Sequence, residues 1–407
     1  MTVSPLAPDS FPPLPMIAGV TLATAASEMK YRGRDDMLLM RFADSMAVAG
    51  IFTRSDTAAA PVIRSRRQLH SSRAPRAILV NAGNANAFTG SAGIAAVETC
   101  CAGLATHIGC EAEDILMAST GVIGEPLDTG ILAAKFGTLA AGGADWQDAA
   151  RAIMTTDTFA KGASATTQIG GEPVTIAGIA KGSGMIAPNM ATMLGFIATD
   201  AAIPSDILAE LLRRATATSF NAITVDSDSS TNDSVFLIAS GAAVHKGVTD
   251  ADDPALDGFR AALDSVMQDL AQQIVRDGEG ATKFVTISVS GADDNAAAHR
   301  IGMAIANSPL VKTAIAGEDA NWGRIVMAIG KAGEGIDQSR IGVSIGGVLI
   351  AADGARVDGY DEAPVAAHMA GDNIAIEVTV GAGTGSARIW TCDLTHGYIS
   401  INADYRS

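Results

Sequence analysis

Short apolar segments of two kinds follow one another along this chain, and their order constrains the fold more than any other feature. Segments of β type occur at 77–90, where the strand runs into a loop rich in Asn and Gly, and at 284–291, 340–350, 373–381 and 386–394. Apolar residues with helical spacing occur at 91–109, 204–220 and 258–275. Because strands and helices are mixed without strict βαβ alternation, the order predicts an α+β layered fold rather than a doubly wound sheet.

The size and composition of the chain allow a large buried core. Of the 407 residues, 48% are hydrophobic and 18% are charged, so extensive disorder is not expected. The length corresponds to about two or three average domains. No internal repeat or long linker is visible, and the first dozen residues, rich in Pro and Ser, are expected to lack regular structure.

The charge of the chain argues against two classes of partner. A formal net charge of −16 repels nucleic acid and anionic membrane surfaces. The basic cluster at 64–67 is expected to lie on a solvated face. No signal peptide and no apolar run of membrane-spanning length is visible. We therefore expect a cytoplasmic protein without nucleic-acid or membrane partners.

Three motifs resemble known binding sites but lack their defining context. The segment GAGTG at 381–385 lies between two strands rather than before a helix, which predicts a hairpin turn instead of a phosphate loop. The acidic segment 226–233 fails as a calcium loop, because Thr231 and Leu237 occupy positions that require Gly and a carboxylate. The adjacent Cys100 and Cys101 lie in an alanine-rich apolar run, which predicts a buried helix rather than a zinc site or a disulfide.

The six histidines are scattered without ligand or triad spacing, so each is expected to be an ordinary surface or core residue. Neither a metal nor another cofactor is expected.

The loop KGSGMIAPNMATMLGF at 181–196 places a threonine, Thr192, among small residues, with Lys181 as its one titratable side chain. A threonine becomes a nucleophile without a partner side chain when it is the first residue of a chain, because its own α-amine then acts as the base. That amine has a pKa of about 7.7–8.0. Cleavage between Ala191 and Thr192 would create such a residue. On the loop alone, a glycine-rich turn without chemistry is the more common explanation.

Eight segments, in order along essentially the whole chain, resemble the ornithine acetyltransferase family, also called the bifunctional glutamate N-acetyltransferases of arginine biosynthesis. These segments lie at 81–90, 119–127, 153–161, 182–201, 224–236, 276–284, 308–325 and 399–407. The fifth departs mildly from the family pattern, since Ser227 and Ser229 stand where Gly and Thr are common.

The resemblance implies a self-cleaving enzyme that moves the acetyl group of N2-acetylornithine to L-glutamate through an acetyl-Thr192 intermediate. Thr120 and Gly121 would form the oxyanion hole through a hydroxyl and a backbone N–H, the pair of donors that a tetrahedral intermediate requires. Residues at family positions that bind substrate are Thr155, Lys181, Thr192, Glu279, Asn402 and Ser407. Lys181 suits an α-carboxylate, and Glu279 suits an amino group.

The resemblance also implies the fold of the protein, the two chains that cleavage produces and their assembly. The family fold resembles the N-terminal-nucleophile amidases, with helices flanking stacked sheets. Cleavage would give an alpha chain, 1–191, and a beta chain, 192–407. The beta chain would include a smaller C-terminal α/β subdomain at about 290–395 and a tail that returns to the active site. Two alpha and two beta chains would associate as a heterotetramer.

Two other functions stay open on the sequence alone, and so does the question of a second acetyl donor. Water could resolve the acyl-enzyme, as in a self-processing N-terminal-nucleophile amidohydrolase or aminopeptidase. A non-catalytic metabolite-binding protein with this fold would keep an intact chain. The sequence does not decide whether acetyl-CoA is a second acetyl donor.

Overall fold

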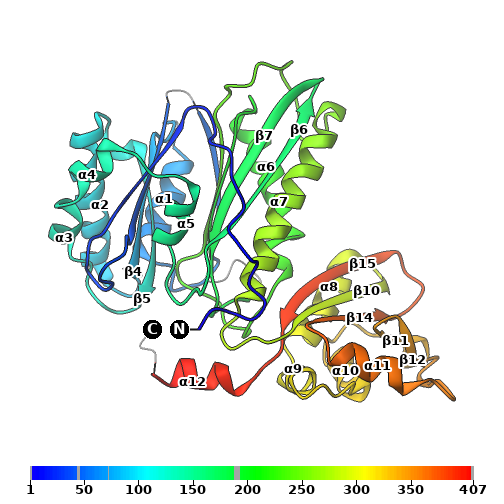
Figure 1. Cartoon of the computed structure of the whole chain (residues 1–407). Helices are drawn as coiled ribbons and strands as arrows, with labels where there is room; N and C mark the ends of the chain where they lie inside the picture. Colours follow the sequence, from blue (N-terminus) through cyan, green and yellow to red (C-terminus); the bar gives the residue numbers. More distant parts are fainter. Residues whose placement is uncertain (1, 44–45, 72, 188–192, 405–407) are drawn as a thin grey trace. The chain divides into compact units, whose positions relative to one another are not determined.

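A computed structural model describes residues 2–43, 46–71, 73–187 and 193–404, which form two compact units (Figure 1). The larger unit contains residues 8–221 and 228–274, and the smaller one contains residues 2–7, 222–227 and 275–404, apart from the gaps just given. Each unit has its own sheet structure. None of the described helices is long and apolar enough to cross a membrane.

The first sheet of the larger unit has, in its described part, the order β1-β2-β4-β5. Its strands are β1 (Val20–Ala25), β2 (Met37–Phe42), β4 (Ala77–Asn84) and β5 (Ile115–Val122). β4 and β5 run parallel, and the other neighbours are antiparallel. All eight residues of β4 are buried, as expected for a strand covered on both faces.

The second sheet of the larger unit has the order β3-β9-β8-β7-β6. Its strands are β3 (Ala47–Phe52), β9 (Ser234–Ala239), β8 (Leu194–Thr199), β7 (Glu172–Lys181) and β6 (Lys161–Ile169). β8 and β9 run parallel, with Leu194 opposite Ser234, and both strands are buried throughout.

The two sheets pack on each other through a shared apolar core. Leu38 and Met40 of β2 lie in one cluster with Ile179 of β7 and with Phe196 and Phe236 of the second sheet. Alternate residues of β2 point the other way, toward the outer helices, because side chains alternate along a strand. The predicted layered α+β fold with stacked sheets is confirmed.

Helices cover the outer faces of both sheets (Figure 1). The first sheet is covered by α2 (Gly90–Ile108) and α4 (Phe136–Ala141), with α3 (Thr129–Ala133) packed on α2. α1 (Ala60–Leu69) contacts β5 and β3, one strand of each sheet, and α5 (Trp146–Ala152) contacts β1 and β7. The second sheet carries α6 (Ser205–Ala217) over β3. α7 (Asp257–Arg276) is tied to β6 by Gln273, whose Nε2 donates to the Gly162 carbonyl oxygen at 3.0 Å. The predicted helices at 91–109, 204–220 and 258–275 are therefore confirmed within a few residues.

The double-cysteine segment lies in α2, as predicted. Cys100 and Cys101 are both free and buried. Burial raises the pKa of each thiol to about 12, so both remain protonated at neutral pH. They fill the core as small apolar side chains.

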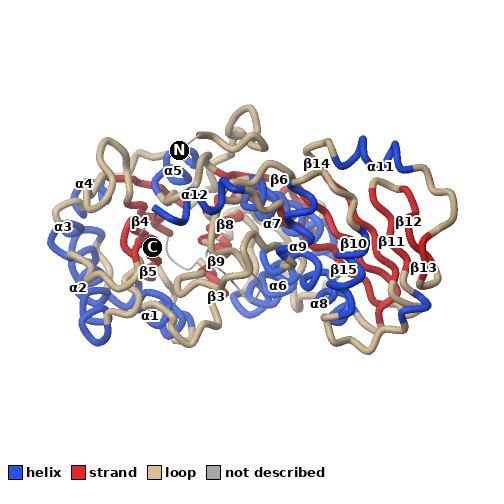
Figure 2. The backbone as a smooth tube through the Cα atoms, turned by 90° about the horizontal axis from the view of Figure 1, so that it is seen from below, coloured by secondary structure: helices blue, strands red, loops and turns tan. Residues whose placement is uncertain are grey.

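The smaller unit is built on a sheet of order β13-β12-β11-β14-β10-β15 (Figure 2). Its strands are β10 (Phe284–Ala292), β11 (Gly342–Ile345), β12 (Val348–Ala352), β13 (Ala355–Arg356), β14 (Asn373–Thr379) and β15 (Gly385–Cys392). Its helices are α8 (Asn295–Ala306), α9 (Pro309–Ala316), α10 (Trp322–Gly330), α11 (Glu362–Met369) and α12 (His396–Asp404). α8 packs on β10 and β15.

Two predictions about this sheet are wrong. The apolar run 340–350 is not one strand, because Gly346 and Gly347, with φ of 59° and 78°, form a turn between β11 and β12. The segment 381–385 is not a hairpin turn, because β14 and β15 are not neighbours. β10 lies between them, parallel to β14 and antiparallel to β15.

The prediction of a solvated basic face at 64–67 is wrong for Arg64. This side chain is 2% exposed, and its Nε lies 3.0 Å from Glu98 Oε2. Its other nitrogens donate to the carbonyl oxygens of Ala112 and Ile115. A guanidinium can be buried when its donors are satisfied in this way, and here it ties α1 to the start of β5.

Candidate active site

The two predicted oxyanion-hole residues lie near the end of β5, beside β4. Thr120 is buried, and Gly121 pairs with Gly83 of β4. Gly121 has φ of +133°, and a Cβ atom at this position would lie 2.2 Å from the carbonyl carbon of Gly83. No side chain fits there, so glycine is required for β4 and β5 to approach this closely.

Lys181 joins two of the other predicted residues. It is the last residue of β7 and is 2% exposed. Its Nζ donates to Thr155 Oγ1 at 2.7 Å and to Thr120 Oγ1 at 3.2 Å. The structure therefore brings Lys181 together with two candidate residues that precede it in the sequence by 26 and 61 positions, Thr155 and Thr120.

A buried aspartate that sequence reasoning missed completes this cluster. Asp157 Oδ1 accepts from Lys161 Nζ and from the Gly182 N–H, both at 2.7 Å. Asp157 Oδ2 accepts from the Thr155 N–H at 3.0 Å and lies 3.8 Å from Lys181 Nζ. Burial opposes ionisation, but Lys161 and Lys181 outweigh it and hold the pKa of Asp157 below its usual range. The only sign of this ion pair in the sequence was the four-residue spacing of Asp157 and Lys161, which is a weak signal.

The charges of this cluster favour an anionic ligand. Among the described ion pairs, two buried ammonium groups, Lys161 and Lys181, share one ionised carboxylate, that of Asp157. An ammonium group only donates hydrogen bonds, so the hydroxyl protons of Thr120 and Thr155 remain available to other acceptors. The cluster can therefore hold a carboxylate or stabilise an oxyanion as it forms.

Two further predicted residues meet in the smaller unit. Asn402 Nδ2, on α12, donates to Glu279 Oε2 at 2.8 Å and to the Tyr398 carbonyl oxygen at 3.1 Å. Close backbone packing holds the two segments together, since a Cβ atom at Gly280 would lie 2.3 Å from the Tyr398 nitrogen. Glu279 is half-buried and Asn402 is exposed, so both side chains are accessible.

The predicted cleavage site, Ala191 and Thr192, and the terminal Ser407 lie outside the described residues. Within the described ranges, no group of three or more His, Cys, Asp or Glu side chains could hold a metal ion.

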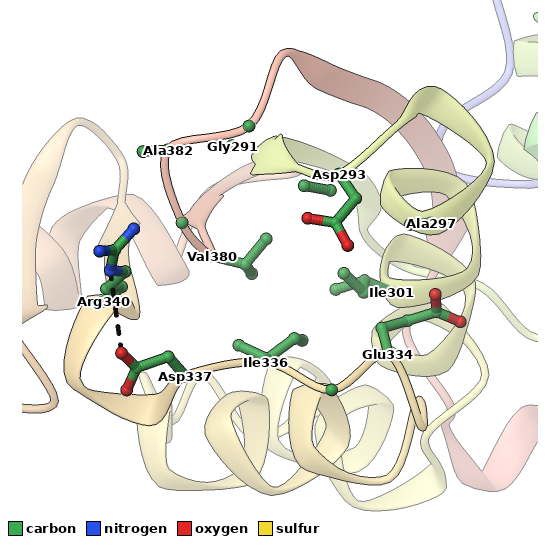
Figure 3. Close-up of a pocket in the computed structure, with 14 residues that line it drawn as sticks. Gly291, Asp293, Ala297, Ile301, Glu334, Ile336, Asp337, Arg340, Val380 and Ala382 are labelled. Atoms are coloured by element: carbon green, nitrogen blue, oxygen red, sulfur yellow. Dashed lines mark ion pairs between the residues drawn. The ribbon is translucent and has the colours of Figure 1, made fainter.

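A pocket of about 390 Å³ in the smaller unit contains none of the candidate residues (Figure 3). Segments 291–293, 334–340 and 380–383 contribute most of its lining. Glu334 in this lining pairs with Arg300 at 2.6 Å, and Asp337 pairs with Arg340 at 3.8 Å. These pairs are exposed at least in part, and they do not form a catalytic arrangement.

Fold and site together define a layered α+β protein with a buried lysine–threonine centre suited to a carboxylate or an oxyanion. The ArgJ family model matches residues 21–407. Proteins named arginine biosynthesis bifunctional protein ArgJ are 54% identical in Gluconobacter oxydans and 53% in Agrobacterium fabrum. The matches cover all of this chain and 96% and 100% of those proteins. The chain belongs to the ArgJ family, which confirms the predicted family.

A solved structure agrees with this assignment. The crystal structure of the arginine biosynthesis bifunctional protein ArgJ from Bacillus halodurans has a TM-score of 0.51 and 42% sequence identity. The match covers 53% of this chain and all of that one.

Proposed function

We propose that this protein is a self-processing acetyltransferase of arginine biosynthesis. It transfers the acetyl group of N2-acetylornithine to L-glutamate, with acetyl-CoA as a second candidate donor. The names of the curated relatives support the pathway. The observation that carries the chemistry is the buried Lys181, which donates to Thr120 and Thr155 beside an ionised Asp157.

The first reaction is processing of the chain. Thr192 Oγ attacks the carbonyl carbon of Ala191, the C–N bond breaks, and the hydroxyl proton ends on the released amine. Water then hydrolyses the ester, which gives a carboxylate at Ala191 and a free α-amine at Thr192. This amine is the base that a threonine nucleophile otherwise lacks.

The second reaction is acetyl transfer. The amine of Thr192 takes the Oγ proton, and Oγ attacks the acetyl carbonyl carbon of acetylornithine. The Thr120 hydroxyl and the Gly121 N–H stabilise the oxyanion. Ornithine leaves as its amine accepts the proton. The amine of glutamate then attacks acetyl-Thr192, which releases N-acetylglutamate and restores the hydroxyl.

The substrates are recognised by hydrogen-bond donors for their carboxylate and by an acceptor for their amino group. Both substrates carry an α-carboxylate, for which Lys181 and Thr155 supply donors. Glu279 supplies an acceptor for an amino group, with Asn402 and Ser407 as further polar contacts. The processed alpha and beta chains remain associated as a heterotetramer.

The test uses the protein as expressed. Two co-purifying fragments, 1–191 and 192–407, are expected on a denaturing gel, and the second should begin with TMLGF on N-terminal sequencing. Thr192→Ala should remain intact and inactive, because it has no hydroxyl to attack with. An intact wild-type chain would overturn the proposal. Release of free acetate from acetylornithine without transfer to glutamate would favour the hydrolase instead.

A further inference from the structure

Strands β4 and β5 lose their regular pairing at the predicted oxyanion-hole residues. Gly83 pairs with Gly121, and both have positive φ, 107° and 133°. The register then shifts, so that Asn84 stands opposite both Thr120 and Val122. A regular ladder fixes the backbone through evenly spaced hydrogen bonds. Where the ladder is interrupted, the position of Thr120 depends on additional contacts.

The side chain of Asn232 supplies such contacts. It is 4% exposed, and its Nδ2 donates to the carbonyl oxygen of Ser119 at 2.8 Å and to that of Ala85 at 2.7 Å. Two carbonyl partners require the NH2 end of the amide, which settles its orientation. Ser119 directly precedes Thr120 on β5, and Ala85 directly follows β4. One amide group therefore bridges the ends of both strands.

Asn232 is itself held on both sides. The Thr231 hydroxyl donates to Asn232 Oδ1 at 2.5 Å, and the Thr231 carbonyl oxygen accepts from the Ala59 N–H at 2.8 Å. On the other side, the Asp233 carbonyl oxygen accepts from the Thr53 N–H at 3.0 Å. The backbone and the side chain of Asn232 are both fixed, so this residue can fix its partners in turn.

The hydrogen bond to the Ser119 carbonyl reaches the Thr120 hydroxyl through one peptide unit. Because a peptide unit is planar, fixing the Ser119 oxygen also fixes the nitrogen and the Cα atom of Thr120. A β-branched side chain has few χ1 rotamers, and Lys181 Nζ donates to Thr120 Oγ1 at 3.2 Å. The hydroxyl oxygen is thus held from the backbone and from Lys181, and its proton stays available to an oxyanion.

A second asparagine bridges the same two segments in a different way. Asn81 is buried, and its Oδ1 accepts from Ser119 Oγ at 2.6 Å while its Nδ2 donates to the Asn84 carbonyl oxygen at 2.8 Å. Asn81 therefore holds the side chain of Ser119, whereas Asn232 holds its carbonyl group. The carbonyl group belongs to the peptide unit of Thr120, which makes Asn232 the more direct support.

We propose that Asn232 is the positioning residue for Thr120 in the oxyanion hole. This inference rests on the proposed function. A donor that is oriented before the reaction stabilises the developing oxyanion without reorganisation. Without the Asn232 amide, the buried Ser119 and Ala85 lose a donor that holds the two strand ends together. Asn232 acts on the transition state through Thr120, so it should affect kcat rather than KM.

The first test is Asn232→Ala, studied as the processed enzyme. Misplacement of a catalytic group is costly, so kcat should fall about tenfold or more with little change in KM. The matched control is Asn86→Ala, which removes another buried amide of the same unit. Asn86 Nδ2 donates to the Gly93 carbonyl oxygen on α2 at 3.0 Å, so its loss should lower stability and leave kcat unchanged. Urea denaturation of both variants compares their stabilities.

A double-mutant cycle tests whether Asn232 acts through Thr120. In a Thr120→Ala background the group to be positioned is absent, so Asn232→Ala should lower kcat much less than it does in the wild type. The same factor in both backgrounds would overturn the inference, because independent effects multiply. If a folded Asn232→Ala chain is not cleaved, Thr120→Ala should also fail to cleave. Cleavage of Thr120→Ala alone would likewise overturn the inference.

The outcomes separate this inference from the proposed function. A wild type that transfers no acetyl group overturns both. An active wild type overturns only the role of Asn232 if Asn232→Ala keeps its kcat, raises KM alone, or loses no more kcat than Asn86→Ala. If Asn232→Ala does not fold, Asn232→Asp replaces it, since it keeps the size and the acceptor for Thr231 and lacks the amide donors. Failure of both variants to fold would assign Asn232 to stability and overturn the inference.

Discussion

The two groups of candidate residues differ in how they are held. In the larger unit, Lys181 and Asp157 are buried, and their hydrogen bonds link Thr120, Thr155 and Lys161. In the smaller unit, Glu279 and Asn402 meet near the surface through one side-chain hydrogen bond of 2.8 Å. A buried network keeps its geometry in the absence of substrate, whereas an accessible pair competes with water.

This difference predicts a division of labour. Groups that stabilise charge in a transition state must be oriented before the reaction, so within the buried cluster we expect Thr120 to affect kcat and Asp157 to affect stability. Groups that only bind substrate contribute to the ground state and the transition state alike, so the accessible pair should affect KM. Two substitutions and one deletion test this division, in order of the expected free-energy effect.

The largest effect is expected for Asp157→Asn, measured as the free energy of unfolding. Removing the carboxylate leaves the buried Lys161 without its charged partner, which typically costs about 3–5 kcal/mol. The pKa of Asp157 is lower in the folded protein than in the unfolded chain. Its stabilising effect is therefore present at neutral pH and shrinks as the pH falls below about 4.

The exposed Asp9→Asn is the matched control and should have a negligible effect on stability. Urea denaturation of the two variants and the wild type at neutral and acidic pH gives the comparison. Equal stability of Asp157→Asn and wild type at pH 7 would show that the buried cluster does not depend on its carboxylate.

The next effect is expected for Thr120→Ala, measured by steady-state kinetics. Loss of one oxyanion-hole donor should lower kcat on the order of a hundredfold, which corresponds to about 2.7 kcal/mol, with a smaller change in KM. Thr106→Ala, which removes an exposed hydroxyl on α2, should have no such effect. A processed Thr120→Ala enzyme with normal kcat would remove Thr120 from the mechanism.

Parts of this molecule could be predicted from sequence because their determinants are local. The apolar spacing of α2 and the glycine that ends it, Gly109 with φ of 72°, lie within one stretch of chain. The neighbours of β10 could not be predicted in this way, because they are selected by contacts between residues far apart in the sequence, such as Phe284 with Asn373 and with Cys392. A hairpin between β14 and β15 was therefore expected where β10 intervenes.

The candidate site shows the same limit. Thr120, Thr155 and Lys181 were identified by resemblance to family segments, and neither periodicity nor spacing indicated that they meet. Asp157 and Asn232 were missed because the sequence does not distinguish a buried polar side chain from an exposed one. Burial and specific partners give each residue its properties, and both depend on the tertiary structure.

The smallest of the three effects is expected for removal of the end of the chain. Terminal residues usually fray and tolerate change. Here Asn402 is tied to Glu279, and a hydrogen bond to a charged group contributes about 1.5–3 kcal/mol. Deleting residues 402–407 should therefore lower kcat/KM by about tenfold or more, mainly through KM. Cleavage at Thr192 should be unaffected, since it involves no substrate.

The controls for this deletion lie on the same helix. Asn402→Ala should reproduce part of the loss, and Ser400→Ala, which changes an exposed hydroxyl two residues earlier, should not. Full activity of the deleted enzyme would show that Asn402 and Ser407 do not contact substrate. Loss of cleavage would assign the tail to the fold, and a fall in kcat at unchanged KM would break the division between the two regions. Binding and charge stabilisation would then depend on both groups of residues together.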